Sequence, residues 1–211
     1  AAWLFENSGA VPVAAGGPAI DGRPATNDPI LFTLQLKVPT NANAIAFDAF
    51  FFTSEFPEYV CSTFTDVFVA LLESSFAGTP ANPADGNTAR ATGVPIISAS
   101  NAFGSTGLFT ACTNGATGCS GTVNGSISTC VESASLAGTG YDVPDNVCQA
   151  GDLIGGGTDW LTAAGNVVPG ETITLRFALW DSSDARLDST VLVDNVRWLE
   201  DAVTPGAQLA E

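Results

Sequence analysis

The sequence has no histidine and no methionine, and its 6 lysine and arginine residues face 22 aspartate and glutamate residues, for a formal net charge of −16. Without histidine, imidazole zinc sites, Ser-His-Asp triads and Cys-His nucleophiles are excluded. Without a basic patch the chain has nothing to neutralise phosphates, which argues against binding to nucleic acid or to an anionic membrane. So acidic a chain suits the recruitment of divalent cations instead.

Charged residues of both signs are scarce, at 13% of the chain, and the mean hydropathy of +0.26 is high for a lone soluble monomer. We therefore expect either a surface rich in small polar residues or apolar surface buried against partners. The apolar runs have only strand length, so no transmembrane helix is predicted. The Ala-Ala start is what cleavage of a signal peptide leaves behind. The 5 cysteines indicate an oxidising compartment, with one thiol left over.

Residues 47–73 predict two strands joined by an acidic, aromatic loop, and the rest of the chain is organised around them. Ile45, Phe47, Ala49 and Phe51 share one parity, which indicates a strand with one buried face. Residues 64–72 are apolar on both faces, as in a central strand. Further strands are predicted at residues 30–38, 94–99, 171–180 and 190–198.

No helical apolar period exceeds two turns, and Gly/Pro-rich turns separate the strands. The expected fold is therefore all-β: a single antiparallel β-sandwich domain of jelly-roll type over residues 1–211, with disulfide-stapled loops.

Two sequence blocks carry a resemblance to a known family. The first is SEFPEYVCSTFTDVF, and the second is GGGTDWLTAAGNVVPGETITLRFALWDSSDARLDSTVLVDNVRW at residues 155–198. Together they resemble the choice-of-anchor L domain of bacterial surface proteins, over most of the chain from about Leu31 to Trp198. The resemblance implies an exported β-rich domain and little about activity. Cys61 departs from it, because a small residue such as glycine is expected there.

Two groups of acidic residues predict a metal site. The first group lies in the loop between the strands expected at residues 171–180 and 190–198 and in the second of these strands. The second group lies in the loop within residues 47–73. Hard cations take six to eight oxygen ligands, which such loops supply, so calcium is the expected ion. The predicted ligands are Glu55, Glu58, Asp66, Asp181, Asp184, Asp188 and Asp194. The alternative is solvated loop acids together with an ion pair of Asp194 with Arg176 or Arg197.

Two other functions compete with this interpretation. Paired carboxylates flanking a cleft are sufficient for glycoside hydrolysis, but nothing in the sequence identifies a cleft, so no catalytic residue and no enzyme is predicted. Aromatic rings can stack on sugars, and the candidates are Trp160, Trp180, Trp198 and Tyr59. The expected function is a calcium-stabilised, non-catalytic extracellular surface or matrix protein that adheres or self-assembles. A carbohydrate-binding module is the alternative.

The cysteine-containing segment of residues 101–141 is small, polar and Gly-rich, so it needs disulfides and packing on the main sheets to hold it. The short turn between Cys112 and Cys119 favours a bridge between these two cysteines. A Cys130–Cys148 bridge would close the next loop and leave Cys61 without a partner in the chain. Sequence alone does not decide connectivity, so other pairings stay open.

Each terminus has two possible arrangements. Residues 1–14 are apolar and predict either an edge strand of the same sandwich or a strand that pairs with a neighbouring subunit. In the second case Trp3, Leu4 and Phe5 are buried between subunits, and a head-to-tail contact of this kind builds a filament. Residues 200–211 form a tail that is either mobile or docked.

Overall fold

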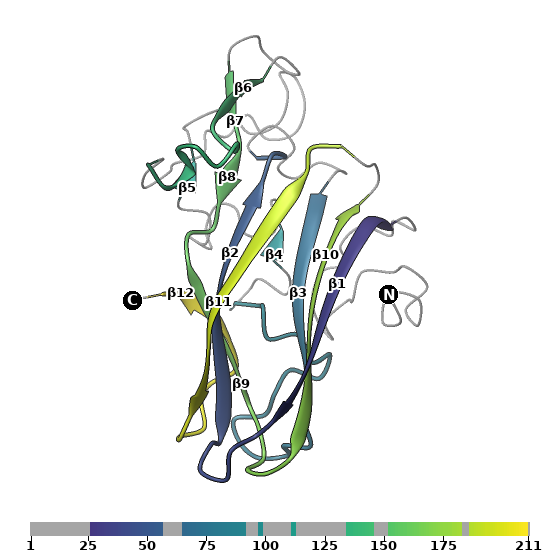
Figure 1. The fold of residues 1–211 in the computed structure, drawn as a ribbon, viewed down its shortest axis with the longest axis vertical. Coiled ribbons are helices and arrows are strands. Elements are labelled where there is room, and N and C mark those ends of the chain that lie inside the picture. Colours follow the sequence, from purple (N-terminus) through teal and green to yellow (C-terminus); the bar gives the residue numbers. More distant parts are fainter. Residues whose placement is uncertain are drawn as a thin grey trace.

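The protein is an antiparallel β-sandwich with two large sheets facing each other (Figure 1). The structure, a computed structural model, describes residues 26–56, 65–91, 97–98, 111–112, 134–145, 152–182 and 186–210. Every strand pair in these residues is antiparallel. The all-β sandwich expected from the sequence is confirmed, while the single-domain assignment stays a prediction.

The strands fall into two large sheets and one small one. The first sheet has the order β1 (Thr26–Lys37), β10 (Thr172–Ser182), β3 (Thr65–Glu73), β4 (Ile97–Ser98). The second has the order β12 (Gly206–Leu209), β9 (Leu161–Asn166), β2 (Ala44–Thr53), β8 (Gly156–Gly157), β5 (Ala111–Cys112), and β11 (Ser189–Leu199) pairs with the other edge of β2. The small sheet joins β6 (Val143–Asp145) to β7 (Asp152–Ile154).

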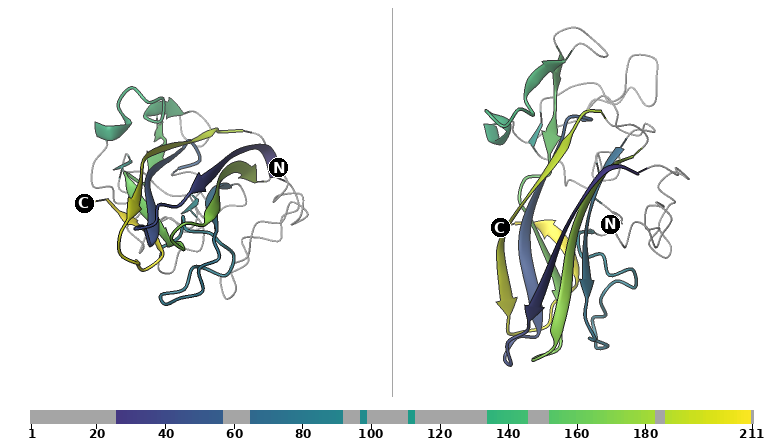
Figure 2. Two further views of the ribbon diagram at one scale, coloured as in Figure 1. Left: turned by 60° about the horizontal axis from the view of Figure 1, so that its bottom comes forward. Right: turned by 45° about the vertical axis from the view of Figure 1, so that its right-hand side comes forward.

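The long strands alternate between the two large sheets along the chain. β1, β3 and β10 belong to the first sheet, and β2, β9 and β11 belong to the second, as Figure 2 shows from two sides. This crossing makes neighbours of strands that are far apart in the sequence. β3 and β10 pair without a break from Glu73 opposite Thr174 to Thr65 opposite Ser182.

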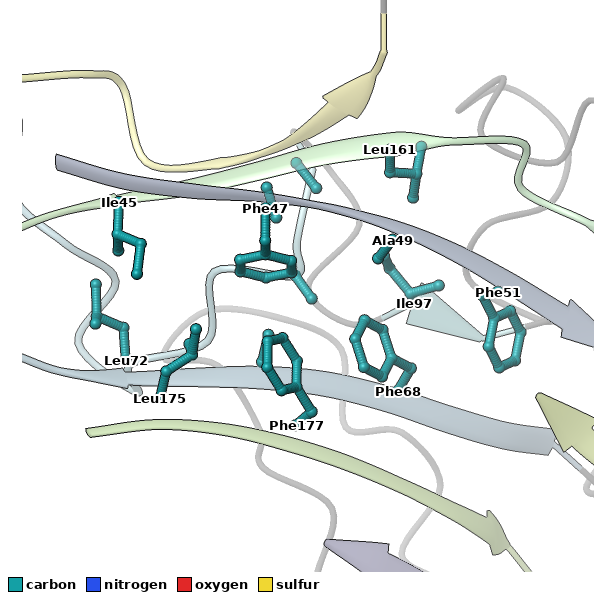
Figure 3. Packing of buried hydrophobic residues seen from close by; sticks show 14 of the residues in the cluster. Ile45, Phe47, Ala49, Phe51, Phe68, Leu72, Ile97, Leu161, Leu175 and Phe177 are labelled. Atoms are coloured by element: carbon teal, nitrogen blue, oxygen red, sulfur yellow. The ribbon is translucent and has the colours of Figure 1, made fainter. Parts of the chain in front are cut away.

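The core lies between the sheets and is built from the alternating apolar residues that the sequence predicts. Figure 3 shows Ile45, Phe47, Ala49 and Phe51 of β2 facing Phe68, Leu175 and Phe177 of the other sheet. The rings of Phe47 and Phe177 meet edge-on, with centroids 5.0 Å apart at 87°. Burying each large side chain of this kind stabilises the fold by about 1.5–3 kcal/mol.

β2 is buried on both faces, whereas its alternation predicted one buried face. On the second face the rings of Phe50 and Phe52 stack with centroids 4.0 Å apart, and Leu136, Tyr141 and Trp160 pack against them. Leu136 belongs to a 3-10 turn, η2 (Ala134–Leu136). The sequence did not show this cover because it comes from a Gly-rich segment distant from β2.

The C-terminal tail docks on the sandwich. β12 pairs with β9, from Gly206 opposite Ala164 to Leu209 opposite Leu161. Before it, the Asn166 side chain donates 2.9 Å to the Val203 carbonyl and accepts 2.8 Å from the Val203 N–H. Neither strand was predicted, because LTAAGN and GAQL are short and made of small residues that carry little apolar periodicity.

Several predictions fall outside the described residues. These include the N-terminal strand of residues 1–14 with Trp3, Leu4 and Phe5. Of the cysteines, Cys112 lies in β5, and the others are outside the described ranges. The bridges Cys112–Cys119 and Cys130–Cys148, and the fate of Cys61, therefore stay predictions.

Candidate metal centre

Three of the predicted ligands come together at one end of the sandwich. A carboxylate oxygen from each of Glu55, Asp66 and Asp181 lies within 4.8 Å of the others. Asp66 stands near the start of β3 and Asp181 near the end of β10, directly opposite each other in the register. Both have the parity of core residues, Phe68 on β3 and Leu179 on β10, so their side chains belong to the face that looks into the sandwich.

The turn after β2 brings Glu55 to this pair. The backbone N–H of Glu55 donates 3.1 Å to the hydroxyl of Thr53, the last residue of β2. Phe56 is fully buried, and its carbonyl accepts 2.6 Å from the Gly155 N–H. Gly155 has φ +104°, and a Cβ there would lie 2.0 Å from the Tyr141 carbonyl oxygen, so only glycine fits. Hydrogen bonds that involve Thr53 and Phe56, before and after Glu55 in the chain, therefore fix the turn that carries Glu55.

Two of these carboxylates are almost fully withdrawn from water. Glu55 is 1% exposed and Asp66 2% exposed, and Asp181 is half-buried. Burial raises the pKa of Asp66 to about 9, and the charge of Glu55 and then that of Asp181 add to the rise, while the nearby Ser189 hydroxyl opposes it. Without a cation the cluster therefore holds a proton at neutral pH, because three charges so close are costly in a low-dielectric site.

The hydrogen bonds of the cluster leave oxygens available to a ligand. Oε2 of Glu55 accepts 2.6 Å from the Asp66 N–H, and Oδ2 of Asp181 accepts 3.0 Å from the Arg186 N–H. Within the part of the chain that the structure describes, the buried Oδ1 of Asp66 and the buried Oγ of Ser189 have no hydrogen-bond partner of normal geometry. Ser189, the first residue of β11, was not among the predicted ligands, and only the register of β11 beside β2 brings it here.

Of the remaining predicted ligands, Asp188 and Asp194 lie in the described residues, and neither joins this cluster. Glu58 and Asp184 lie outside the described residues. The carbonyl of Asp188 accepts a hydrogen bond from the Ser54 N–H at 3.3 Å, but its exposed side chain is not one of the converging carboxylates. Asp194 lies opposite Asp48, five positions along β2 from Thr53, which is about 17 Å at the rise of a strand.

The arginines make ion pairs other than those the sequence suggested. Arg197 pairs with Asp48 at 3.0 Å and Arg176 pairs with Glu73, so neither takes Asp194. Burial opposes ionisation of Asp48, but hydrogen bonds from Asn195, Thr162 and Arg197 and the charge of Arg197 bring its pKa below the usual value. This network holds the bulge of β11 between Asp194 and Arg197 against β2.

The aromatic residues proposed for sugar stacking are largely engaged in packing. Trp180 is 1% exposed, Trp160 meets Phe50 edge-on at 5.7 Å, and Trp198 packs against the main core. Tyr59 lies outside the described residues. The carboxylates are also poorly placed for glycoside hydrolysis, because a polysaccharide cannot reach groups as buried as Glu55 and Asp66.

A family model matches most of this chain. The model of the choice-of-anchor L domain matches residues 31–196, a range that includes Glu55, Asp66 and Asp181. No curated protein and no solved structure gives a significant match. Among the described residues, no helix has the length and apolar character needed to cross a membrane.

Proposed function

The chain belongs to the choice-of-anchor L domain family, and we propose that it is a non-catalytic subunit of an extracellular surface or matrix that self-assembles and is stabilised by calcium. Family membership indicates a bacterial surface-associated, exported protein. The observation that carries the calcium part is the convergence of Glu55, Asp66 and Asp181 within 4.8 Å. Two of them are buried and one offers an oxygen without a hydrogen-bond partner in the described chain.

Electrostatics supports a divalent cation at this position. Buried carboxylates need a counter-charge, and one proton on Asp66 removes only one of three negative charges. The donors are all oxygens, which suits a hard cation. Three carboxylates supply three to six ligand oxygens, and the Ser189 hydroxyl, backbone carbonyls and water are available to complete a calcium shell of six to eight.

The same placement favours a structural role for the ion. Glu55 follows β2 of one sheet, whereas Asp66 and Asp181 belong to β3 and β10 of the other. An ion bound by all three residues connects the two sheets at this end of the sandwich. A ligand that binds only the folded state stabilises it, by about 2.7 kcal/mol at a free concentration of 100 times Kd.

Thermal unfolding of the metal-stripped protein tests this part. We expect calcium to raise the Tm by several degrees, EDTA to reverse the rise, and magnesium to substitute poorly because it demands a tighter octahedral shell. Calorimetric titration should give one calcium per chain. An unchanged Tm together with no heat of calcium binding would remove calcium from the proposal.

Self-assembly is the second part of the proposal. It is supported by the high mean hydropathy, the charged fraction of 13% and the apolar N-terminal residues Trp3, Leu4 and Phe5. Sedimentation and electron microscopy of the purified chain test it, and we expect concentration-dependent head-to-tail polymers. A chain that stays monomeric at all concentrations contradicts this part and leaves the calcium part standing.

A further inference from the structure

The sandwich has one side on which both sheets end in an exposed strand. In the described part of the chain, β1 pairs only with β10 and β11 pairs only with β2. Residues of both strands line a common groove, and Figure 2 shows them running along the same side of the sandwich. Each strand therefore presents an edge of backbone N–H and C=O groups that another strand can use.

The groove between these strands is apolar and reaches the core. Its volume is about 350 Å³, and its lining contains no charged side chain. The lining residues are Ile30, Phe32, Phe68, Phe177, Ala178, Leu179, Ser189, Thr190, Val191 and Val193. The ring of Phe32 stacks on that of Phe177, with centroids 6.4 Å apart, so the floor of the groove is the central core itself.

Large apolar side chains stay exposed at this groove. Ile30 is 64% exposed and Phe32 57% exposed, and Val193 on the opposite wall is also exposed. The section of β1 from Ile30 to Leu36 carries no charge, whereas lone edge strands are usually protected by charged residues or proline. Exposed apolar surface that is continuous with the core marks a binding surface. No described residue covers these side chains, so the occupant is to be sought outside the described residues.

We propose that the groove receives residues 1–13 of a second copy of this chain, bound as an added β-strand. The sequence AAWLFENSGAVPV fits this occupant. Trp3, Phe5, Val11 and Val13 share one parity, so in an extended strand their side chains lie on one face, suited to an apolar groove. Glu6 is the one charged residue of the segment, in keeping with a groove lined by uncharged side chains.

The dimensions are also compatible. Residues 1–25 precede β1 and span up to about 85 Å when extended, which is enough to leave one copy and reach the next. The added strand can form backbone hydrogen bonds with the edges of β1 and β11 while its larger side chains fill the groove, as in other cases of strand addition. Each copy then offers one segment and one groove, so the contact is head-to-tail and propagates.

This inference rests on the self-assembly part of the proposed function, and its test separates the two. Val193→Lys and Ile30→Lys place a charge in the groove at exposed positions, where the fold tolerates it. Leu192→Lys is the matched control, because Leu192 is 46% exposed on the same strand and does not line the groove. Trp3→Glu with Phe5→Glu in the full chain disables the segment.

We expect the wild type and Leu192→Lys to polymerise, and the groove variants and the segment variant to remain monomeric with an unchanged Tm. A 1:1 mixture of the Val193→Lys chain and the Trp3→Glu/Phe5→Glu chain should form a heterodimer and go no further, because one intact segment meets one intact groove. Sedimentation velocity distinguishes these species. A synthetic peptide of residues 1–13 should cap wild-type polymers.

Three results would overturn the inference. Groove variants that polymerise like the Leu192→Lys control show that assembly uses another surface, while self-assembly itself stands. A wild type that stays monomeric while the peptide binds the segment variant, but not the wild type, shows that the segment closes its own groove. If the wild type stays monomeric and neither the wild type nor any variant binds the peptide, both the proposed groove contact and self-assembly are contradicted.

Discussion

The backbone N–H of Asp66 donates a 2.6 Å hydrogen bond to Oε2 of Glu55, eleven residues earlier in the chain. One carboxylate of the candidate metal centre thus fixes the backbone that carries another. Asp66 in turn lies opposite Asp181 across the β3–β10 pair. The cluster is therefore built into the strands and their connecting turn, and its members respond together when one is changed.

Asp181→Asn should abolish most of the stabilisation by calcium. The asparagine keeps an oxygen that can accept from the Arg186 N–H, so the local backbone is retained. In EDTA we expect the variant to be at least as stable as the wild type, because the negative charge of Asp181 beside Glu55 and Asp66 has gone. In saturating calcium it should lose most of the stabilisation of about 3 kcal/mol.

Thermal unfolding with and without calcium measures both effects. The matched control is Asp194→Asn, which removes an exposed aspartate that does not join the cluster and should respond to calcium like the wild type. Equal calcium responses in the two variants would count against Asp181 as a ligand.

Calcium binding should release a proton near neutral pH. The pKa of Asp66 is raised by burial and by Glu55 to about 9, from 3.8, so the metal-free folded chain holds a proton that the unfolded chain has lost. This group therefore makes the metal-free protein less stable as pH rises from about 4 to about 9. Calcium competes with that proton, so its affinity should increase over the same range.

Calorimetry in buffers of different ionisation enthalpy measures the proton release. We expect close to one proton per calcium at pH 7.5 and a smaller number above pH 9. Asp66→Asn should bind calcium weakly and release no proton. A binding enthalpy that is the same in all buffers would contradict the protonated state of Asp66.

Glu171 should make the fold sensitive to acid. Burial acts to raise the pKa of Glu171, but hydrogen bonds from Ser74, Val168 and Ser75 outweigh it and lower the pKa below 4.5. A lowered pKa contributes stability above the unfolded value that is lost as pH falls through the folded value. Glu171→Gln should cost about 1 kcal/mol at pH 7.

The difference between wild type and Glu171→Gln should shrink as the pH is lowered from 5 to 3, which urea unfolding at each pH measures. A difference that stays constant would mean that the carboxylate charge contributes nothing to these bonds.

Phe47 and Phe32 should differ sharply in their contributions to stability, although both rings contact Phe177. Phe47 is 1% exposed between the sheets, so Phe47→Ala should cost about 3–5 kcal/mol through a cavity. Phe32 lies at the open groove, so Phe32→Ala should cost less than about 1.5 kcal/mol in the monomer. Chemical unfolding compares them, and equal losses would show that the groove is filled within a single chain.

The thiols should be detected as two bridges per chain. Intact-mass measurement under denaturing, non-reducing conditions should show four cysteines oxidised within the chain, as Cys112–Cys119 and Cys130–Cys148. Cys61 should react with an alkylating agent or join another chain. A peptide map that connects Cys61 to Cys112 or Cys130 would show that this pairing is wrong.

Alternation of apolar residues was enough to predict most of the long strands. It works for β2 and β10 because apolar residues with a two-residue period share one face only in a strand, whereas β3 was predicted from a run that is apolar on both faces. It failed for β9 and β12, whose small residues are held by pairing and by the contacts of Asn166 with Val203. Pairing partners of this kind leave no mark in local sequence.

The sequence by itself determined the chemistry available to this protein: no imidazole, an excess of carboxylates, and strands apolar enough to form a sandwich. Only the tertiary structure decided which carboxylates meet. Glu55, Asp66 and Asp181 converge because the register of β3 against β10 and the turn after β2 bring them to one end of the sandwich, whereas Asp194 lies along β11 beside Asp48. The groove between β1 and β11 is likewise a property of sheet order. Sheet order and the pairing of strands that are distant in the sequence are set by long-range packing, so no local pattern of residues encodes them.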